Sequence, residues 1–230
     1  MRLRAGTAPR YHRGVALIDD DALVLDSLPY GELHLILLLL TPSAGVFRCV
    51  LRGARGGKSP QAAATQLLSL IRVVAFQGRR AELATVRQVE LKQSSFPLAR
   101  DLERAAAAAV VAELLTTFCP QGEPAPRPFR LGVAALNALL EETAPATVVA
   151  YCQLWILTLS GLMPPLEDCP LGPDDLEFLV ACRTLAPTEL PRPPSPELAR
   201  WLDRRVRSEA DRPLRALDFL RAGGEETRPR

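Results

Sequence analysis

The sequence predicts an α+β protein in which a small β-barrel precedes an all-helical domain. Three observations lead to this fold class. Short apolar segments of strand length, separated by turn residues, fill residues 22–96. Helical periodicity and alanine-rich sequence replace them after Pro97, and the net charge changes sign between the two halves. A hydrophobic fraction of 48% in 230 residues is sufficient for a packed core.

The predicted barrel is organised around a hairpin. Residues 35–40 form an apolar run that suits a strand buried on both faces, residues 41–45 supply turn chemistry, and residues 46–51 form the returning strand. This strand ends in the segment Arg52-Gly53-Ala54-Arg55-Gly56-Gly57-Lys58-Ser59. Its cations sit among glycines that cannot block the close approach of an anion, so phosphate is the expected ligand.

Three further segments complete the predicted barrel. Residues 22–28, 66–76 and 82–92 read as strands, while an apolar run at 14–18 is expected to stop at a solvated turn formed by Asp19, Asp20 and Asp21. About five strands in such a short stretch favour a closed barrel, which leaves no exposed edges. An OB-fold is the commonest such barrel with a basic face, and residues 1–21 become a basic N-terminal extension.

The charge distribution indicates a polyanionic partner for the first domain. Residues 1–100 carry a net charge of +7 and residues 101–230 a net charge of −5, which together give the overall +2. Aromatic residues for base stacking are scarce, and for Phe47 and Phe76 a place in the core is favoured over a stacking platform. DNA binding is therefore expected to be mainly electrostatic, independent of base sequence and weakened by salt. The predicted DNA-binding residues are Arg48, Arg52, Arg55, Lys58, Arg79, Arg80, Arg87 and Lys92.

Catalytic chemistry finds little support. The glycine-rich segment resembles a phosphate-binding P-loop, but three residues instead of four separate its first glycine from the glycine-lysine pair, and no βαβ alternation surrounds it. His34 is expected to be structural, and the paired acidic residues Glu141-Glu142 and Asp174-Asp175 are expected at helix ends. We therefore predict no catalytic residue and no enzyme activity.

The five cysteines are odd in number and irregularly spaced. They are expected to be buried free thiols in a reducing compartment. The chain has no hydrophobic signal core at its start and no apolar run of membrane-spanning length, so a cytoplasmic location without membrane contact is expected.

The second predicted domain covers residues 97–222 and precedes a disordered tail at 223–230. Proline-rich loops separate its helices, and Ser195 followed by Pro196 has the pattern of a helix start. The expected helices cover residues 98–118, 129–142, 145–163, 173–185, 196–208 and 212–222.

Several short motifs, in a fixed order, resemble the RecO family of bacterial DNA repair proteins. The first domain carries a tyrosine-glycine-glutamate turn, an apolar strand that ends in threonine, a glycine, and a glycine-alanine-arginine motif followed by lysine-serine. The helical part carries further family-like segments. These motifs are Tyr30-Gly31-Glu32, residues 37–41, Gly45, Gly53-Ala54-Arg55, Lys58-Ser59, Ala112-Glu113-Leu114 and residues 157–164.

The resemblance implies an N-terminal OB-fold, a helical domain and a role as a recombination mediator. Members of this family bind single- and double-stranded DNA, anneal complementary strands, contact the C-terminal tail of the single-strand binding protein, and act with RecR to load RecA. The same partners and activities are therefore expected of this chain, with no cofactor.

The sequence departs from the family at the zinc site, which lies near residues 165–190. Many members carry two Cys-x-x-Cys pairs there, whereas this chain keeps Cys169 and Cys182, one thiol from each pair. Structural zinc needs four ligands, so no metal is predicted. The loss of these ligands motivates a second hypothesis, a degenerate OB-fold protein-interaction module without DNA binding. Nucleotide hydrolysis at the P-loop-like segment is a third.

Overall fold

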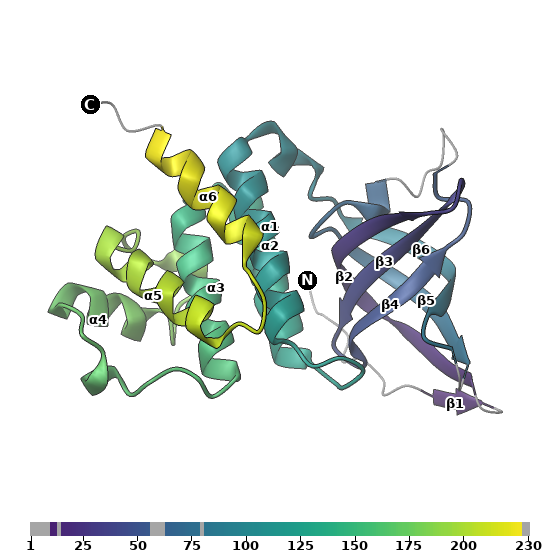
Figure 1. Cartoon of the computed structure of the whole chain (residues 1–230), viewed down its shortest axis with the longest axis horizontal. Coiled ribbons are helices and arrows are strands. Elements are labelled where there is room, and N and C mark those ends of the chain that lie inside the picture. The colour runs from purple at the N-terminus through teal and green to yellow at the C-terminus, as the bar shows by residue number, and fades with distance from the viewer. Residues whose placement is uncertain (1–9, 13–14, 56–62, 79–80, 227–230) are drawn as a thin grey trace. The chain divides into compact units, whose positions relative to one another are not determined.

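The structure is a computed structural model that describes most of the chain, namely residues 10–12, 15–55, 63–78 and 81–226. The chain divides into two compact units (Figure 1). The first unit contains the β-strands and comprises Met1–Pro97 with Cys119–Val133. The second unit is helical and comprises Leu98–Phe118 with Ala134–Arg230.

Five strands close into a barrel in the first unit. They are joined in the order β2-β3-β4-β6-β5, and β5 pairs again with β2. Among the named strands of the described residues, β4 and β6 alone pair in parallel, and a short strand β1 (Arg10–His12) adds to the start of β2. This arrangement confirms the predicted fold class, an OB-fold followed by helices. The strands are β2 (Val15–Tyr30), β3 (His34–Thr41), β4 (Gly45–Leu51), β5 (Leu70–Gly78) and β6 (Ala84–Gln93).

The expected turn at the three consecutive aspartates is wrong, because all three lie inside β2. Asp20 is 1% exposed, and its carboxylate accepts hydrogen bonds from the backbone N–H groups of Ser43 at 3.1 Å and Asp21 at 2.9 Å. Asp19 and Asp21 pair with basic side chains of neighbouring strands, as described below. The barrel therefore begins at Val15, seven residues before the expected boundary at Ala22.

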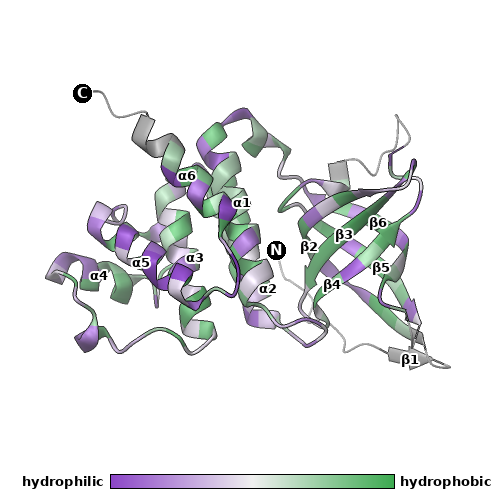
Figure 2. Ribbon diagram, viewed as in Figure 1, coloured by the Kyte–Doolittle hydropathy of each residue, from purple (hydrophilic) through white to green (hydrophobic). Residues whose placement is uncertain are grey.

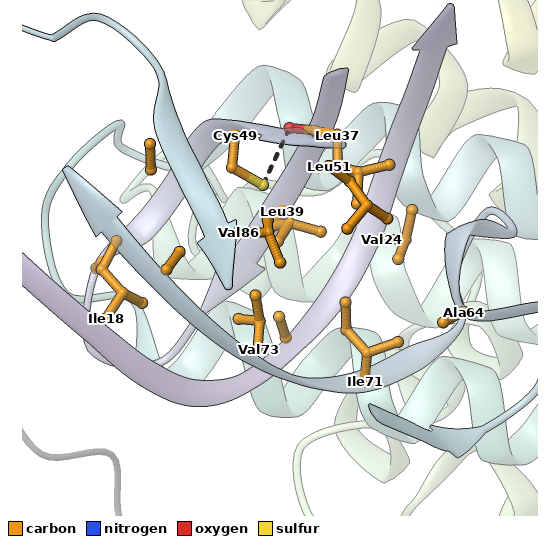
Figure 3. Close-up of a cluster of buried hydrophobic side chains, with 14 of the residues drawn as sticks. Ile18, Val24, Leu37, Leu39, Cys49, Leu51, Ala64, Ile71, Val73 and Val86 are labelled. Atoms are coloured by element: carbon orange, nitrogen blue, oxygen red, sulfur yellow. Dashed lines mark hydrogen bonds between the residues drawn. The ribbon is translucent and has the colours of Figure 1, made fainter. Parts of the chain in front are cut away.

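The interior of the barrel is filled by every second residue of each strand. Leu37 and Leu39 of β3 meet Cys49 of β4 and Val73 of β5 in one buried cluster (Figure 3). The Cys49 thiol donates to the Leu37 carbonyl at 3.8 Å, and burial raises the pKa of this thiol to about 12. β3 is hydrophobic along most of its length (Figure 2), yet Ile36 is only half-buried, so β3 is not buried on both faces throughout as expected.

The β3–β4 turn is fixed by a segment that follows far along the chain. Gly45 has a φ of +62°, and a Cβ at this position would lie 2.1 Å from the carbonyl oxygen of Glu123. Val46 donates its backbone N–H to Pro120, and Gly122 donates to Val46, at 3.2 and 3.0 Å respectively. Only glycine combines this backbone conformation with so close an approach.

Six α-helices are assigned between Leu102 and Glu226. They differ from the expected ranges mainly at their ends: α2 begins at Pro126 because proline suits the first helical position, and α6 continues to Glu226. None of the helices described is both long and apolar enough to cross a membrane. The helices are α1 (Leu102–Phe118), α2 (Pro126–Leu140), α3 (Pro145–Leu159), α4 (Pro173–Ala181), α5 (Pro196–Glu209) and α6 (Arg215–Glu226).

Two carboxylates of the helical unit, Glu113 and Asp203, bind groups of α6. Glu113 of α1 accepts the backbone N–H groups of Ala216 and Leu217 at 3.1 to 3.2 Å, so it caps the start of α6. The carboxylate of Asp203 in α5 accepts two hydrogen bonds from the guanidinium of Arg221 in α6, at 2.6 and 2.9 Å. It also accepts one from the side-chain amide of the fully buried Gln153 in α3, at 2.8 Å. The negative charge of this half therefore serves partly to hold α6 in place.

Candidate nucleic-acid interface

The alternation of β4 places one of the predicted DNA-binding residues, Arg48, on the outer surface. Cys49 and Leu51 lie in the barrel core, so Arg48 and Val50 point to the outer surface. Arg48 is exposed there, and Arg52 is exposed in the turn that directly follows β4. Within the described parts of the chain, neither guanidinium group has an ion pair or a hydrogen bond.

A third arginine lies on the neighbouring strand. Val50 pairs with Thr85 in the parallel β4–β6 ladder, and Arg87 follows two residues after Thr85, as Arg52 follows Val50. Arg87 is exposed, and its Cζ atom lies 6.0 Å from the centroid of the Phe76 ring, within the range of a cation–π contact. It forms no ion pair with any other described residue. Together, Arg48, Arg52 and Arg87 are named the open arginines below.

Arg55 is held against the turn between β2 and β3. Its guanidinium donates to the carbonyl of Gly31 at 2.9 Å, and its backbone N–H donates to the carbonyl of Leu33 at 3.1 Å. Gly53, with a φ of +73°, donates its N–H to Nδ1 of His34 at 3.1 Å. His34 thus has the structural role expected of it, and Arg55 keeps further N–H groups for a ligand.

Lys92 is in a different electrostatic environment. Its ammonium group lies 3.0 Å from the carboxylate of Asp21, which is 5% exposed. Arg72 of β5 lies 2.6 Å from Asp19 and 3.5 Å from Asp21. These carboxylates of β2 partly neutralise both cations, so a phosphate approaching Lys92 would compete with a carboxylate already in place.

The other three predicted DNA-binding residues, Lys58, Arg79 and Arg80, lie outside the described residues. In the sequence, Lys58 comes three positions after Arg55, and Arg79 and Arg80 lie between the end of β5 and the start of β6. Their contribution stays a prediction from the sequence.

The outer surface also carries apolar side chains that sequence reasoning missed. Phe47 packs against the core as expected, but Phe76 points outward and is 38% exposed. Leu28 and Leu33 are each 54% exposed, and Tyr30 is 49% exposed, at and beside the β2–β3 turn. The Tyr30-Gly31 turn was the available signal for the latter group, because a turn places its neighbours at the surface.

In the region where many members of the RecO family carry zinc ligands, Cys169 and Cys182 make hydrogen bonds within the protein. The Cys169 thiol donates to the carbonyl of Pro165 at 3.4 Å, and the carbonyl of Cys182 accepts Nε1–H of Trp155 at 3.1 Å. All five cysteines are buried free thiols, as predicted. No group of three or more His, Cys, Asp or Glu side chains suitable for a metal is found among the described residues.

The surroundings of the glycine-rich segment do not match those of a P-loop. A P-loop joins a strand of a parallel βαβ unit to a helix. Here β4 is antiparallel to β3, its parallel contact with β6 spans two residue pairs, and the intervening strand β5 is antiparallel to β6. These strands therefore supply no framework for nucleotide hydrolysis.

Comparison with known families covers almost the whole chain. Residues 15–95 match the family described as Recombination protein O N terminal, and residues 99–217 match Recombination protein O C terminal. Similar curated proteins are named DNA repair protein RecO. Those of Symbiobacterium thermophilum and Desulfitobacterium hafniense are 33% and 35% identical to this chain over 67% and 65% of its length.

The chain spans 61% and 54% of the length of these two relatives. The protein of Alkaliphilus metalliredigens is 32% identical over 66% of this chain and 62% of its own length. Neither the family descriptions nor these names denote an enzyme, in agreement with the prediction. Two consecutive family matches on the barrel and on the helices confirm the resemblance seen in the sequence, and the chain belongs to the RecO family.

Proposed function

We propose that this chain is a non-enzymatic mediator of DNA repair and recombination in the cytoplasm, and that its barrel binds DNA through the open arginines. The observation that carries the proposal is that these arginines have no ion-pair partner among the described residues. Arg48 lies on β4, Arg52 in the turn directly after it, and Arg87 on the neighbouring strand β6. A cation without a partner is available to a phosphate without prior loss of an ion pair.

Arginine suits this ligand chemically. The planar guanidinium group presents several N–H donors that match phosphate oxygens, and it stays charged at every relevant pH. β4 carries no Asp or Glu between Gly45 and Leu51, so no side chain of this strand repels a phosphate backbone. Contacts of this kind fix a strand without reading its base sequence.

The position within the barrel supports the same proposal. In OB-folds, the second and third strands and the loops beside them commonly bind nucleic acid. These strands correspond here to β3 and β4, and Arg55 joins the turn after β4 to the turn before β3. A rigid connection between the two turns keeps the cations at the edge of this surface in place.

The finer activities follow from the family. We propose that the chain binds single- and double-stranded DNA, promotes annealing, and supports RecA loading with RecR and the tail of the single-strand binding protein. Annealing needs no catalytic group, because neutralised backbones approach each other with less repulsion. Membership of the RecO family supports these roles.

Charge reversal tests the proposed surface. The triple variant Arg48→Glu/Arg52→Glu/Arg87→Glu is titrated with labelled single-stranded DNA at several salt concentrations. We expect affinity at low salt to fall on the order of 100-fold, at ~1 kcal/mol for each lost contact. The slope of log affinity against log salt should fall by about 2, since each single-strand phosphate contact contributes about 0.7.

A matched variant separates the surface from net charge. Arg183→Glu/Arg200→Glu/Arg204→Glu makes the same change in charge at exposed positions of the helical unit. We expect this variant to bind nearly as the unchanged protein does. Equal losses in both variants, with both folded by circular dichroism, would mean that the open arginines are not the site. A flat titration of the unchanged protein would favour the protein-interaction module instead.

A further inference from the structure

The outer surface of the barrel carries a continuous row of side chains that phosphate contacts alone do not explain. Cross-strand pairs connect it from β2 through β3, β4, β6 and β5 back to β2. Five of its members lie next to core residues on their strands and therefore face outward, and Leu28 faces outward as the cross-strand partner of Ile36. This outer belt consists of Leu28, Ile36, Val50, Thr85, Phe76 and Leu17.

The belt is apolar apart from Thr85 and is partly open to solvent. Leu28 is 54% exposed and Phe76 is 38% exposed, while the other members are half-buried. Contiguous exposed apolar surface is a feature of many binding sites on soluble domains. The identity of the ligand is then decided by the charges around the belt.

The charges beside the belt are mainly positive where it crosses β4 and β6. Arg48 and Arg52 flank Val50 on β4, and Arg87 lies two residues beyond Thr85 on β6. Asp26 lies on the β2 side, where its carboxylate accepts the N–H of Ser27. A ligand with apolar faces joined by a chain of negative charges complements this arrangement, and unpaired nucleotides have both features.

Phe76 and Arg87 form the part of the belt best suited to a base. The guanidinium lies 6.0 Å from the ring centroid on the exposed side of the barrel. Aromatic rings and guanidinium planes both stack on bases, whatever the base identity. Resting on the proposed DNA binding, we infer that the unpaired bases of a single strand lie against the outer belt, with Phe76 as the stacking residue that sets the preference for single over double strands.

Duplex DNA cannot use the belt in this way. Its bases are already stacked on one another inside the helix, so only its phosphates and groove edges are accessible. The open arginines serve both forms of DNA, whereas Phe76 contributes only when bases are unpaired. The belt therefore gives single strands an advantage that is independent of phosphate contacts and of salt.

An abasic oligonucleotide tests this inference, because it keeps the phosphates and lacks the bases. Affinities are measured by fluorescence anisotropy for an oligo-thymidine strand, an abasic strand of the same length and a duplex. We expect the unchanged protein to bind the thymidine strand about tenfold more tightly than the abasic strand, in the range for one stacked base. Phe76→Ala should remove most of this difference and leave the salt slope and the duplex affinity unchanged.

Two further variants provide controls. Phe76→Tyr keeps an aromatic ring and should retain the preference. Phe219→Ala removes a ring from α6 that is 58% exposed, more than the 38% of Phe76, and should change nothing. If the unchanged protein binds the thymidine and abasic strands equally, or if Phe76→Ala keeps the preference, the inference is wrong while DNA binding stands. If no DNA form binds at all, the proposed function itself fails.

Discussion

Arg72 and Lys92 contact carboxylates of β2, whereas Arg48 and Arg52 contact none among the described residues, although all four belong to the same barrel. The difference originates in β2, whose Asp19 and Asp21 face β5 and β6. Positive charge in this domain therefore has two uses. Cations beside β2 hold strands together, and cations beside β4 remain available to a ligand.

This contrast predicts that a carboxylate placed among the open arginines should pair with them, as Asp21 pairs with Lys92, and should weaken DNA binding. Val50→Glu introduces one between Arg48 and Arg52 at a half-buried outward position. DNA affinity should fall about tenfold, with a salt slope lower by about 1 to 2, because the new charge competes with phosphate. Val50→Gln has the same shape without the charge and should lose much less in a parallel titration. Equal losses would indicate a steric effect only.

The reverse change removes the carboxylate from the β2 side. Asp21→Asn leaves Lys92 and Arg72 without their shared partner, and both are about one-third exposed. The free energy of unfolding should fall by about 1 to 2 kcal/mol in urea denaturation, while DNA affinity rises by less than about fivefold. Lys92→Gln should leave DNA affinity almost unchanged. A loss of affinity in Lys92→Gln as large as that in the open-arginine variants would abolish the distinction between the two sides.

The smallest expected effect concerns Asp20, the buried carboxylate of β2 that accepts hydrogen bonds from backbone N–H groups. Burial raises its pKa, although hydrogen bonds from Ser43 and Asp21 oppose this effect. The folded state therefore binds the proton more tightly than the unfolded chain, whose carboxyl has a pKa near the ordinary 3.8. As pH rises from about 4 through the raised pKa, the protein should lose stability relative to Asp20→Asn. Urea denaturation of both proteins across this range measures the difference; a constant difference would contradict the expected shift.

Much of the fold was predictable because its signals are local. The run at residues 35–40, the turn around Gly45 and the alternation through Cys49 and Leu51 are each contained in a few residues. The strand through Asp20 was not predictable in this way. Its hydrogen-bond partner is Ser43, 23 residues along the chain, and without that partner three aspartates resemble a solvated turn.

The types of residue in the candidate site were predictable from the sequence, but which cations form ion pairs was not. Arg48 and Lys92 look alike in the sequence, and only the fold brings Lys92 to Asp21, 71 positions away. Phe76 was assigned to the core, but the register of β5 against β6 pairs it with the outward-facing Thr85 and leaves Ala75 inside. Side-chain direction in a barrel depends on register, and register depends on distant partners.

The double pairing of β2 determines how the barrel can come apart. One half of this strand pairs with β5, the other half pairs with β3, and Leu23 has partners on both sides. Because the same strand forms both sets of hydrogen bonds, β2 cannot separate from β5 without disturbing its pairing with β3, and the reverse is also true. Backbone amides of the β2–β3 and β2–β5 pairs should therefore exchange their hydrogens with solvent at a common, slow rate, through unfolding of the entire barrel.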